Sequence, residues 1–231
     1  MIQTAFRLVI FDCDGVLVDS EPISNQVFAD MLGEIGIPVT LDYMFDNFMG
    51  HSMAYCLGRV ASLLGRPPAP DFAEAYRRRV KQALAAQLKP VPGIAAALDA
   101  IDLPYCVASN GDDDKIRATL EITGLLARFA GKQFSVSDVA RGKPAPDIFL
   151  YAAQQHGINP AACLVIEDSC VGVKAAVAAG MTVFGYAALT SAVRLIEAGC
   201  DGVFSDMAQL PQMVGGGRNP IIEGNYLFSN I

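Results

Sequence analysis

Long apolar runs, paired cysteines and histidines are scarce in this sequence. Although 52% of the 231 residues are hydrophobic, no run is long enough to span a bilayer. The apolar start is short and leads directly into acidic residues, which does not fit a signal peptide. The six cysteines are scattered without a Cys-x-x-Cys pair, which argues against a disulfide scaffold or a zinc site. We therefore expect a cytoplasmic protein with reduced thiols.

Positive charge is also in short supply. The net charge of −7 disfavours nucleic acid and anionic membrane surfaces as partners. The two histidines, His51 and His156, lie far apart in the sequence, which argues against a Ser-His-Asp triad and against a histidine-rich metal site.

What the sequence does contain is a regular alternation of strands and helices. Short apolar, β-rich runs predict strands, and amphipathic periods between most of them predict helices. This alternation indicates a doubly wound, parallel α/β sheet. The expected strands cover residues 6–10, 104–108, 132–136, 162–166, 181–186 and 202–204, and the expected helices cover 112–122, 146–156 and 169–179.

One long interval breaks this alternation. Between the first two strands the sequence shows four helical patterns and no convincing strand, with Thr40 and Asp71 as expected N-caps. We interpret this block as an inserted helical cap, residues 21–88, on a catalytic core of residues 1–20 and 89–231. The four helices are expected at 22–35, 41–48, 53–64 and 72–88. The tail 215–231 has no assigned role, although residues 225–228 fit a packed extension or a dimer contact.

The first predicted strand ends in two carboxylates. Asp12 and Asp14 are two residues apart, so both side chains share one face if the strand continues, and Gly15 then permits a tight turn. Carboxylates at the end of a parallel strand can hold a hard cation or perform covalent and acid/base chemistry. The alternative is a simple β-turn rich in Asp and Gly.

Three further polar clusters follow other strands, and each also has a purely structural interpretation. Ser109-Asn110-Gly111 suits a phosphate or an ordinary N-cap. Lys143 stands on a proline-stiffened loop, where it is either a fixed cation or a surface lysine. Glu167-Asp168 suits Mg²⁺ or a charged N-cap. Because these clusters lie at strand ends, all of them are expected in the crevice that holds Asp12 and Asp14.

In this order, the four clusters resemble the motifs of the haloacid dehalogenase-like hydrolase superfamily, in its phosphatase branch. The resemblance covers nearly the whole chain, and the helical block resembles the cap of the β-phosphoglucomutase-like subgroup. Within that subgroup the sequence is most similar to bacterial sugar-phosphate phosphatases, including the 6-phosphogluconate phosphatase type.

The resemblance implies a role for each motif residue. Asp12 would be the nucleophile that becomes an aspartyl-phosphate, and Asp14 the general acid and base. Ser109, Asn110 and Lys143 would hold the phosphoryl oxygens, and Lys143 should lower the pKa of Asp12. The cofactor Mg²⁺ would bind the Asp12 carboxylate, the Asp14 backbone carbonyl and Asp168, with Glu167 either a ligand or a supporting group.

Two differences between this sequence and the mutase branch of the superfamily favour hydrolysis. The mutase branch has a histidine where this chain has Ser24, and an arginine soon after the cap-loop glycine, where this chain reads Gly50-His51-Ser52-Met53. We therefore predict a Mg²⁺-dependent phosphatase of small phosphorylated metabolites, a monomer or weak homodimer. A β-phosphoglucomutase-like phosphomutase and a non-catalytic metabolite-binding protein on the same fold remain as alternatives.

Substrate choice is expected to depend on the cap. On the last cap helix, Arg77 and Arg79 flank an apolar face, and His51 lies on a cap loop. Each of the three could contact an anionic or hydroxylated substrate. The alternative is that the arginines are solvated and cover the small core of the cap.

Overall fold

The computed structural model describes residues 6–49, 51 and 53–216. Two positions of the cap loop, 50 and 52, lie outside the described residues. The same holds for residues 217–231, so the expectations for the tail segment 225–228 fall outside as well. In the described part of the chain, no helix combines the length and apolar character needed to cross a bilayer.

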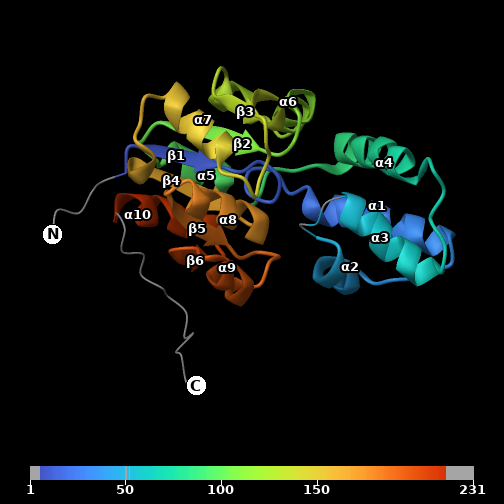
Figure 1. Ribbon diagram of the computed structural model, residues 1–231. Coiled ribbons are helices and arrows are strands. Elements are labelled where there is room, and N and C mark those ends of the chain that lie inside the picture. The colour runs from blue at the N-terminus through green and yellow to red at the C-terminus, as the bar shows by residue number, and fades with distance from the viewer. Residues whose placement is uncertain (1–5, 50, 52, 217–231) are drawn as a thin grey trace.

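One sheet of six parallel strands forms the centre of the described chain (Figure 1). The strand order β3-β2-β1-β4-β5-β6 places β1 in the interior of the sheet, where its four residues are fully buried. The predicted doubly wound sheet is confirmed, with boundaries shifted by one or two residues. The strands are β1 Leu8–Phe11, β2 Tyr105–Ser109, β3 Gln133–Ser135, β4 Cys163–Glu167, β5 Thr182–Tyr186 and β6 Gly202–Phe204.

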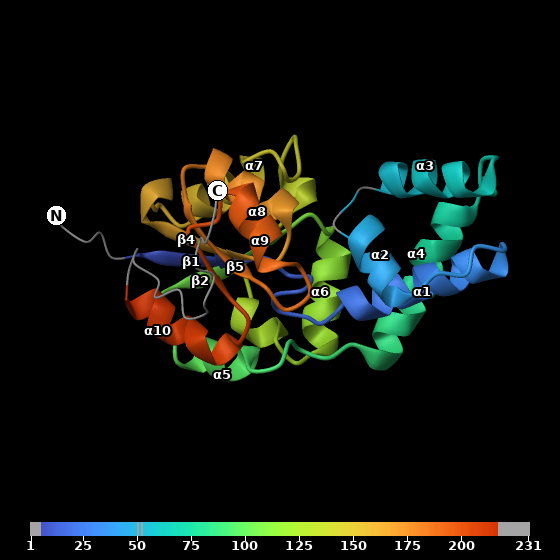
Figure 2. The ribbon, with the colours of Figure 1, turned by 90° about the horizontal axis from the view of Figure 1, so that it is seen from below.

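Helices cover both faces of the sheet. Val9 and Phe11 of β1 pack in one apolar cluster, and Leu8 and Ile10 pack in another, as expected for alternating side chains of a buried strand. The first cluster includes α5 Ile94–Asp99, α6 Asp113–Ile122 and α10 Leu210–Gly215. The second includes α7 Asp147–Gln155, α8 Cys170–Ala178 and α9 Ala192–Ala198. Figure 2 shows α5 and α10 on one side of the sheet and α7, α8 and α9 on the other.

The sequence interpretation missed α5, α9 and α10, which are only six or seven residues long. Amphipathic periodicity is hard to recognise over fewer than two turns. Short 3-10 turns complete the core at Leu126–Phe129, Val136–Asp138, Pro160–Ala162 and Met207–Gln209.

The four predicted cap helices are confirmed as α1 Glu21–Glu34, α2 Leu41–Asn47, α3 Met53–Leu64 and α4 Phe72–Gln87. They stand beside the sheet and share an apolar cluster of their own (Figure 1). Phe28 lies at its centre, with ring centroids 5.3 Å from Phe48, 5.6 Å from Phe72 and 5.0 Å from Tyr76. The contacts with Phe72 and Tyr76 are edge-to-face, a geometry that adds to the energy of apolar burial.

One of the two predicted N-caps is confirmed. Thr40 has an extended backbone, and its hydroxyl accepts a hydrogen bond from the backbone N–H of Tyr43 at 3.2 Å. Asp71 stands at the predicted N-cap position of α4 but does not cap it, because its side chain makes no capping hydrogen bond. Its ψ of 2° differs from the extended conformation that aims an N-cap side chain at the first helical turn.

Two paired linkers connect the sheet with the helical block. The N–H of Asp19 donates to the carbonyl of Lys89 at 3.0 Å, and the N–H of Val91 donates to the carbonyl of Leu17 at 3.0 Å. The chain therefore enters and leaves the block at one place, where its two segments run antiparallel. The division at residues 20/21 and 88/89 stays a prediction.

Candidate active site

The site lies at the carboxyl end of β1. At this strand the order in which the chain adds strands to the sheet reverses. Strands β2 and β3 lie on one side of β1, and β4 to β6 lie on the other. Such a switch point leaves a crevice at the carboxyl ends of the strands. Asp12 immediately follows β1, and its N–H donates to the carbonyl of Ile166 in β4 at 2.9 Å. Ser109 and Glu167 are the last residues of the neighbouring strands β2 and β4.

A cavity of about 1240 Å³ lies over these strand ends and extends to the helical block. It brings together every core residue that the sequence predicted for the site, together with two of the three predicted cap residues. Its lining includes Asp12, Asp14, Ser109, Asn110, Lys143, Glu167, Asp168, His51 and Arg77.

Lys143 crosses the site as a buried cation. Its Nζ lies 2.5 Å from Asp12 Oδ1, 2.7 Å from Glu167 Oε1 and 2.9 Å from the carbonyl oxygen of Ala108. Only 4% of its side chain is exposed. Burial alone would lower the pKa of Lys143, but Asp12 and Glu167 outweigh burial and raise it. Lys143 therefore keeps its positive charge beside the Asp12 carboxylate.

The loop that carries Lys143 is held by Asn110. The Asn110 side-chain oxygen accepts from the N–H of Lys143 at 2.8 Å, and its side-chain nitrogen donates to the carbonyl of Lys143 at 3.1 Å. Both ends of the amide are thus engaged, so Asn110 positions Lys143 in this structure. Ser109 Oγ accepts from the N–H of Gly111 at 3.1 Å, which leaves its hydroxyl hydrogen for a ligand.

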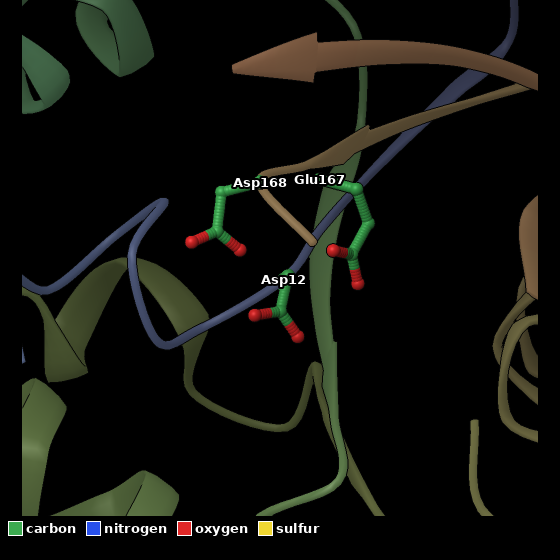
Figure 3. A group of neighbouring side chains, drawn as sticks. All are labelled: Asp12, Glu167 and Asp168. Atoms are coloured by element: carbon green, nitrogen blue, oxygen red, sulfur yellow. The ribbon is translucent and has the colours of Figure 1, made fainter. Parts of the chain in front are cut away.

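Three carboxylates next to Lys143 could hold a metal ion. Asp12, Glu167 and Asp168 each offer an oxygen within 4.8 Å of the others, and all three side chains are buried (Figure 3). Burial raises the pKa of Asp12 to about 7, although Lys143 acts to lower it as expected. Burial and the neighbouring Glu167 also raise the pKa of Asp168. A hard divalent cation fits this oxygen cluster because it would offset the crowded negative charge.

Glu167 is more fully engaged than its neighbours. One of its oxygens accepts from Lys143, and the other accepts from the N–H of Ser169 at 3.1 Å and the Ser169 hydroxyl at 2.9 Å. These contacts favour a supporting role for Glu167, which would fix Lys143 beside the metal site.

Asp14 has a different electrostatic environment from Asp12. Its two oxygens accept from the Ser20 hydroxyl and from Lys115 Nζ, each at 2.6 Å. Burial opposes ionisation of Asp14, but Lys115 and Ser20 together hold its pKa below the usual value. The sequence interpretation missed both partners. One feature of the sequence could have indicated the role of Lys115. It is the first cation after three aspartates, at the start of a helix that was expected to face the crevice.

Two glycines leave room for the carboxylates. Gly15 has a φ of 76°, and a Cβ there would lie 2.0 Å from Asp168 Oδ2. A Cβ on Gly172, in the first turn of α8, would lie 1.7 Å from Glu167 Oε1. Larger residues at either position would displace the side chains that line the site.

Replacing Gly172 with alanine should therefore destabilise the protein by about 1–3 kcal/mol, the usual cost of overpacking a buried site. Denaturant unfolding followed by circular dichroism would measure the change. Gly33→Ala in α1 is the matched control, because a Cβ there meets no atom within 4 Å and alanine is the better helix former. Equal stability of the two variants would contradict the crowding described at Glu167.

Of the three predicted cap residues, two line the cavity and one does not. His51 lines the cavity and stacks on Tyr55, with ring centroids 3.9 Å apart. Arg77 also lines the cavity and is exposed. The structure does not bring Arg79 to the site. Its guanidinium instead forms a surface ion pair with Glu34 of α1 at 2.6 Å.

Fold and site together define an α/β protein with a buried lysine–carboxylate centre beneath a helical cap. The family model for haloacid dehalogenase-like hydrolases matches residues 6–180, and the chain belongs to this family. It is 32% identical to 6-phosphogluconate phosphatase of Escherichia coli K12, over 91% of this chain and 96% of that protein.

Solved structures agree with this assignment. A haloacid dehalogenase-like protein of Agrobacterium tumefaciens superposes with a TM-score of 0.88 and 36% identity, over 92% of this chain and 99% of that one. A family hydrolase of Deinococcus radiodurans, solved with bound phosphate and sodium, superposes with a TM-score of 0.79 and 33% identity, over 90% and 94% of the two chains.

Proposed function

We propose that this protein is a Mg²⁺-dependent phosphatase that hydrolyses small phosphorylated sugars or sugar acids through an aspartyl-phosphate intermediate. The observation that carries the proposal is the contact of Lys143 with Asp12, with Asp14 lining the same cavity. The similarity to a 6-phosphogluconate phosphatase and to a hydrolase with bound phosphate supports it.

In the first half of the reaction, an Asp12 oxygen attacks the phosphorus of the substrate. A bond forms between Asp12 and phosphorus, and the bond from phosphorus to the ester oxygen breaks. Asp14 gives a proton to the departing oxygen, so the alcohol leaves neutral. Because Lys115 and Ser20 hold the pKa of Asp14 below its usual value in the structure, Asp14 must take up this proton when the substrate binds. Lys143 and the Ser109 hydroxyl stabilise the charge on the phosphoryl oxygens.

In the second half, Asp14 acts as a base. It removes a proton from a water molecule, and the resulting hydroxide oxygen attacks the phosphorus of the aspartyl-phosphate. The bond between Asp12 and phosphorus breaks, which releases inorganic phosphate and restores the Asp12 carboxylate.

The Asp12 and Asp168 carboxylates and the Asp14 backbone carbonyl would hold Mg²⁺. When bound, the ion neutralises negative charge on the phosphate and on the nucleophile. This neutralisation matters because the Asp12 carboxylate and a phosphate dianion repel each other.

Phosphate release should therefore stop when EDTA removes divalent cations and should return when excess Mg²⁺ is added. A malachite green assay with a sugar phosphate measures both steps, and EDTA presaturated with Mg²⁺ controls for direct effects of the chelator. Full activity after exhaustive treatment with EDTA would contradict the metal requirement.

A panel of phosphorylated metabolites would test the proposal as a whole and separate it from the alternatives. A phosphatase releases inorganic phosphate from several panel members. A phosphomutase instead forms an isomer in a reaction that depends on a bisphosphate primer, and a binding protein releases no phosphate. Ser24, which lines the cavity in place of the mutase histidine, favours hydrolysis.

A further inference from the structure

Six cationic side chains among the described residues line the cavity, and four of them form no ion pair with the proposed catalytic carboxylates. Lys115 and Lys143 are paired with Asp14 and Asp12. The others form no ion pair with the described residues, so their charge is available to a ligand. They are Arg77 and Lys81 of α4, Lys174 of α8 and Arg194 of α9.

The two cations of α4 face an acidic neighbour. Helix α4 packs against α6, and Asp112 and Asp114 at the start of α6 line the same cavity. These aspartates offset the positive charge of Arg77 and Lys81 and make this side of the cavity less attractive to an anion.

Lys174 and Arg194 line the cavity from α8, which begins just after the carboxylate cluster, and from α9. Cys170 follows Asp168 by two residues, and its Sγ lies 3.5 Å from the carbonyl oxygen of Arg194. Lys174 is one helical turn beyond Cys170, on the same side of α8. The second turn of α8 and the first turn of α9 therefore bring two cations to the cavity. Glu197, one turn beyond Arg194, also lines the cavity and forms no ion pair with the described residues.

His51 approaches the same cavity from the helical block. Partial burial lowers the pKa of His51, and the positive charges of Arg194 and Arg59 lower it further. Arg194 and His51 both line this cavity. The two cations Lys174 and Arg194 favour an anion in this part of the cavity, and the neutral His51 imidazole can add a hydrogen-bond donor.

We infer that Arg194, with Lys174 and His51, forms a second anion-binding subsite that receives the carboxylate of a phosphorylated sugar acid. This inference rests on the proposed function, in which Lys143 and Ser109 hold the phosphate of the same substrate. Arg194 is the central member, since its guanidinium can donate two parallel hydrogen bonds to a carboxylate. The subsite would favour sugar-acid phosphates over neutral sugar phosphates of equal length.

The test compares two substrates that differ only at the far end. 6-Phosphogluconate carries a carboxylate where glucitol 6-phosphate carries a hydroxymethyl group. The wild-type protein should hydrolyse both and should show the higher kcat/KM with 6-phosphogluconate. In Arg194→Gln the ratio of the two kcat/KM values should fall about tenfold or more, mainly through KM for the acid. Arg194→Lys should restore part of the ratio.

Arg78→Gln is the matched control, because Arg78 is exposed on α4 and does not line the cavity. Its ratio should equal that of the wild type, and thermal melting would show that each variant is folded. If the Arg194→Gln ratio is unchanged, or if the wild type prefers glucitol 6-phosphate, the inference is wrong while the phosphatase proposal stands. If the wild type releases phosphate from no phosphate ester, the proposed function itself fails.

Discussion

Asp12→Asn should abolish phosphate release, with kcat falling by about 10⁴-fold or more, because the neutral amide cannot attack phosphorus. The fold should persist, since asparagine has nearly the same shape and can still accept a hydrogen bond from Lys143. Lys143 would also remain paired with Glu167 at 2.7 Å. Steady-state assays would measure the activity, and thermal unfolding would measure the stability.

Asp102→Asn provides the control for the Asp12 variant. Asp102 is exposed and lies outside the cavity, so its replacement should leave kcat and the melting temperature near those of the wild type. Residual turnover of more than a few per cent in Asp12→Asn would argue against an aspartyl-phosphate intermediate.

Lys143→Ala should damage both activity and stability. Without this cation, the Asp12, Glu167 and Asp168 carboxylates would lie together in a buried site, and no other cation among the described residues is in hydrogen-bond contact with them. Breaking a buried ion pair typically costs about 3–5 kcal/mol of folding free energy. The phosphoryl oxygens would also lose their buried cation, so kcat should fall by about 10²-fold or more.

Adding Mg²⁺ should recover part of the stability lost in Lys143→Ala, because a cation that binds the folded state stabilises it. Urea unfolding with and without Mg²⁺ would show this. Lys89→Ala is the comparison, since Lys89 is an exposed lysine outside the cavity and its loss should change the stability by less than about 0.5 kcal/mol. Equal stabilities of the two variants would show that Lys143 is not the cation that holds the carboxylates together.

The sheet and the position of the site were predictable because both depend on local patterns. The buried run at β1 ends at the residue before Asp12, Ser109 ends β2 and Glu167 ends β4, whereas Lys143 lies on a loop beyond the 3-10 turn that follows β3. In a parallel sheet, strand ends meet at one edge. A prediction that Asp12, Ser109 and Glu167 lie at strand ends was therefore enough to predict that they lie in the crevice.

The contacts within the site were not predictable from local patterns. Lys143 meets Asp12 from 131 positions away along the chain, and Lys115 meets Asp14 from 101 positions away. No periodicity encodes such pairs. The same limit applies to Arg79. Its position beside the apolar face of α4 was predictable, but its contact with Glu34 of a different helix was not. The role of Asn110 in holding the Lys143 loop also depends on tertiary structure, and its contact with the phosphate stays a prediction.

The paired linkers at Asp19–Lys89 and Leu17–Val91 have a consequence for how this protein can diversify. Because the chain leaves the sheet and returns to it through neighbouring segments, the spacing of the two junctions does not depend on what lies between them. Insertions, deletions or exchange of the intervening helices need not shift a single strand of the sheet. A lineage with this architecture can therefore acquire new specificities by exchanging these helices, provided that the packing of α4 against α6 is kept, while the reactive groups at the strand ends are inherited unchanged.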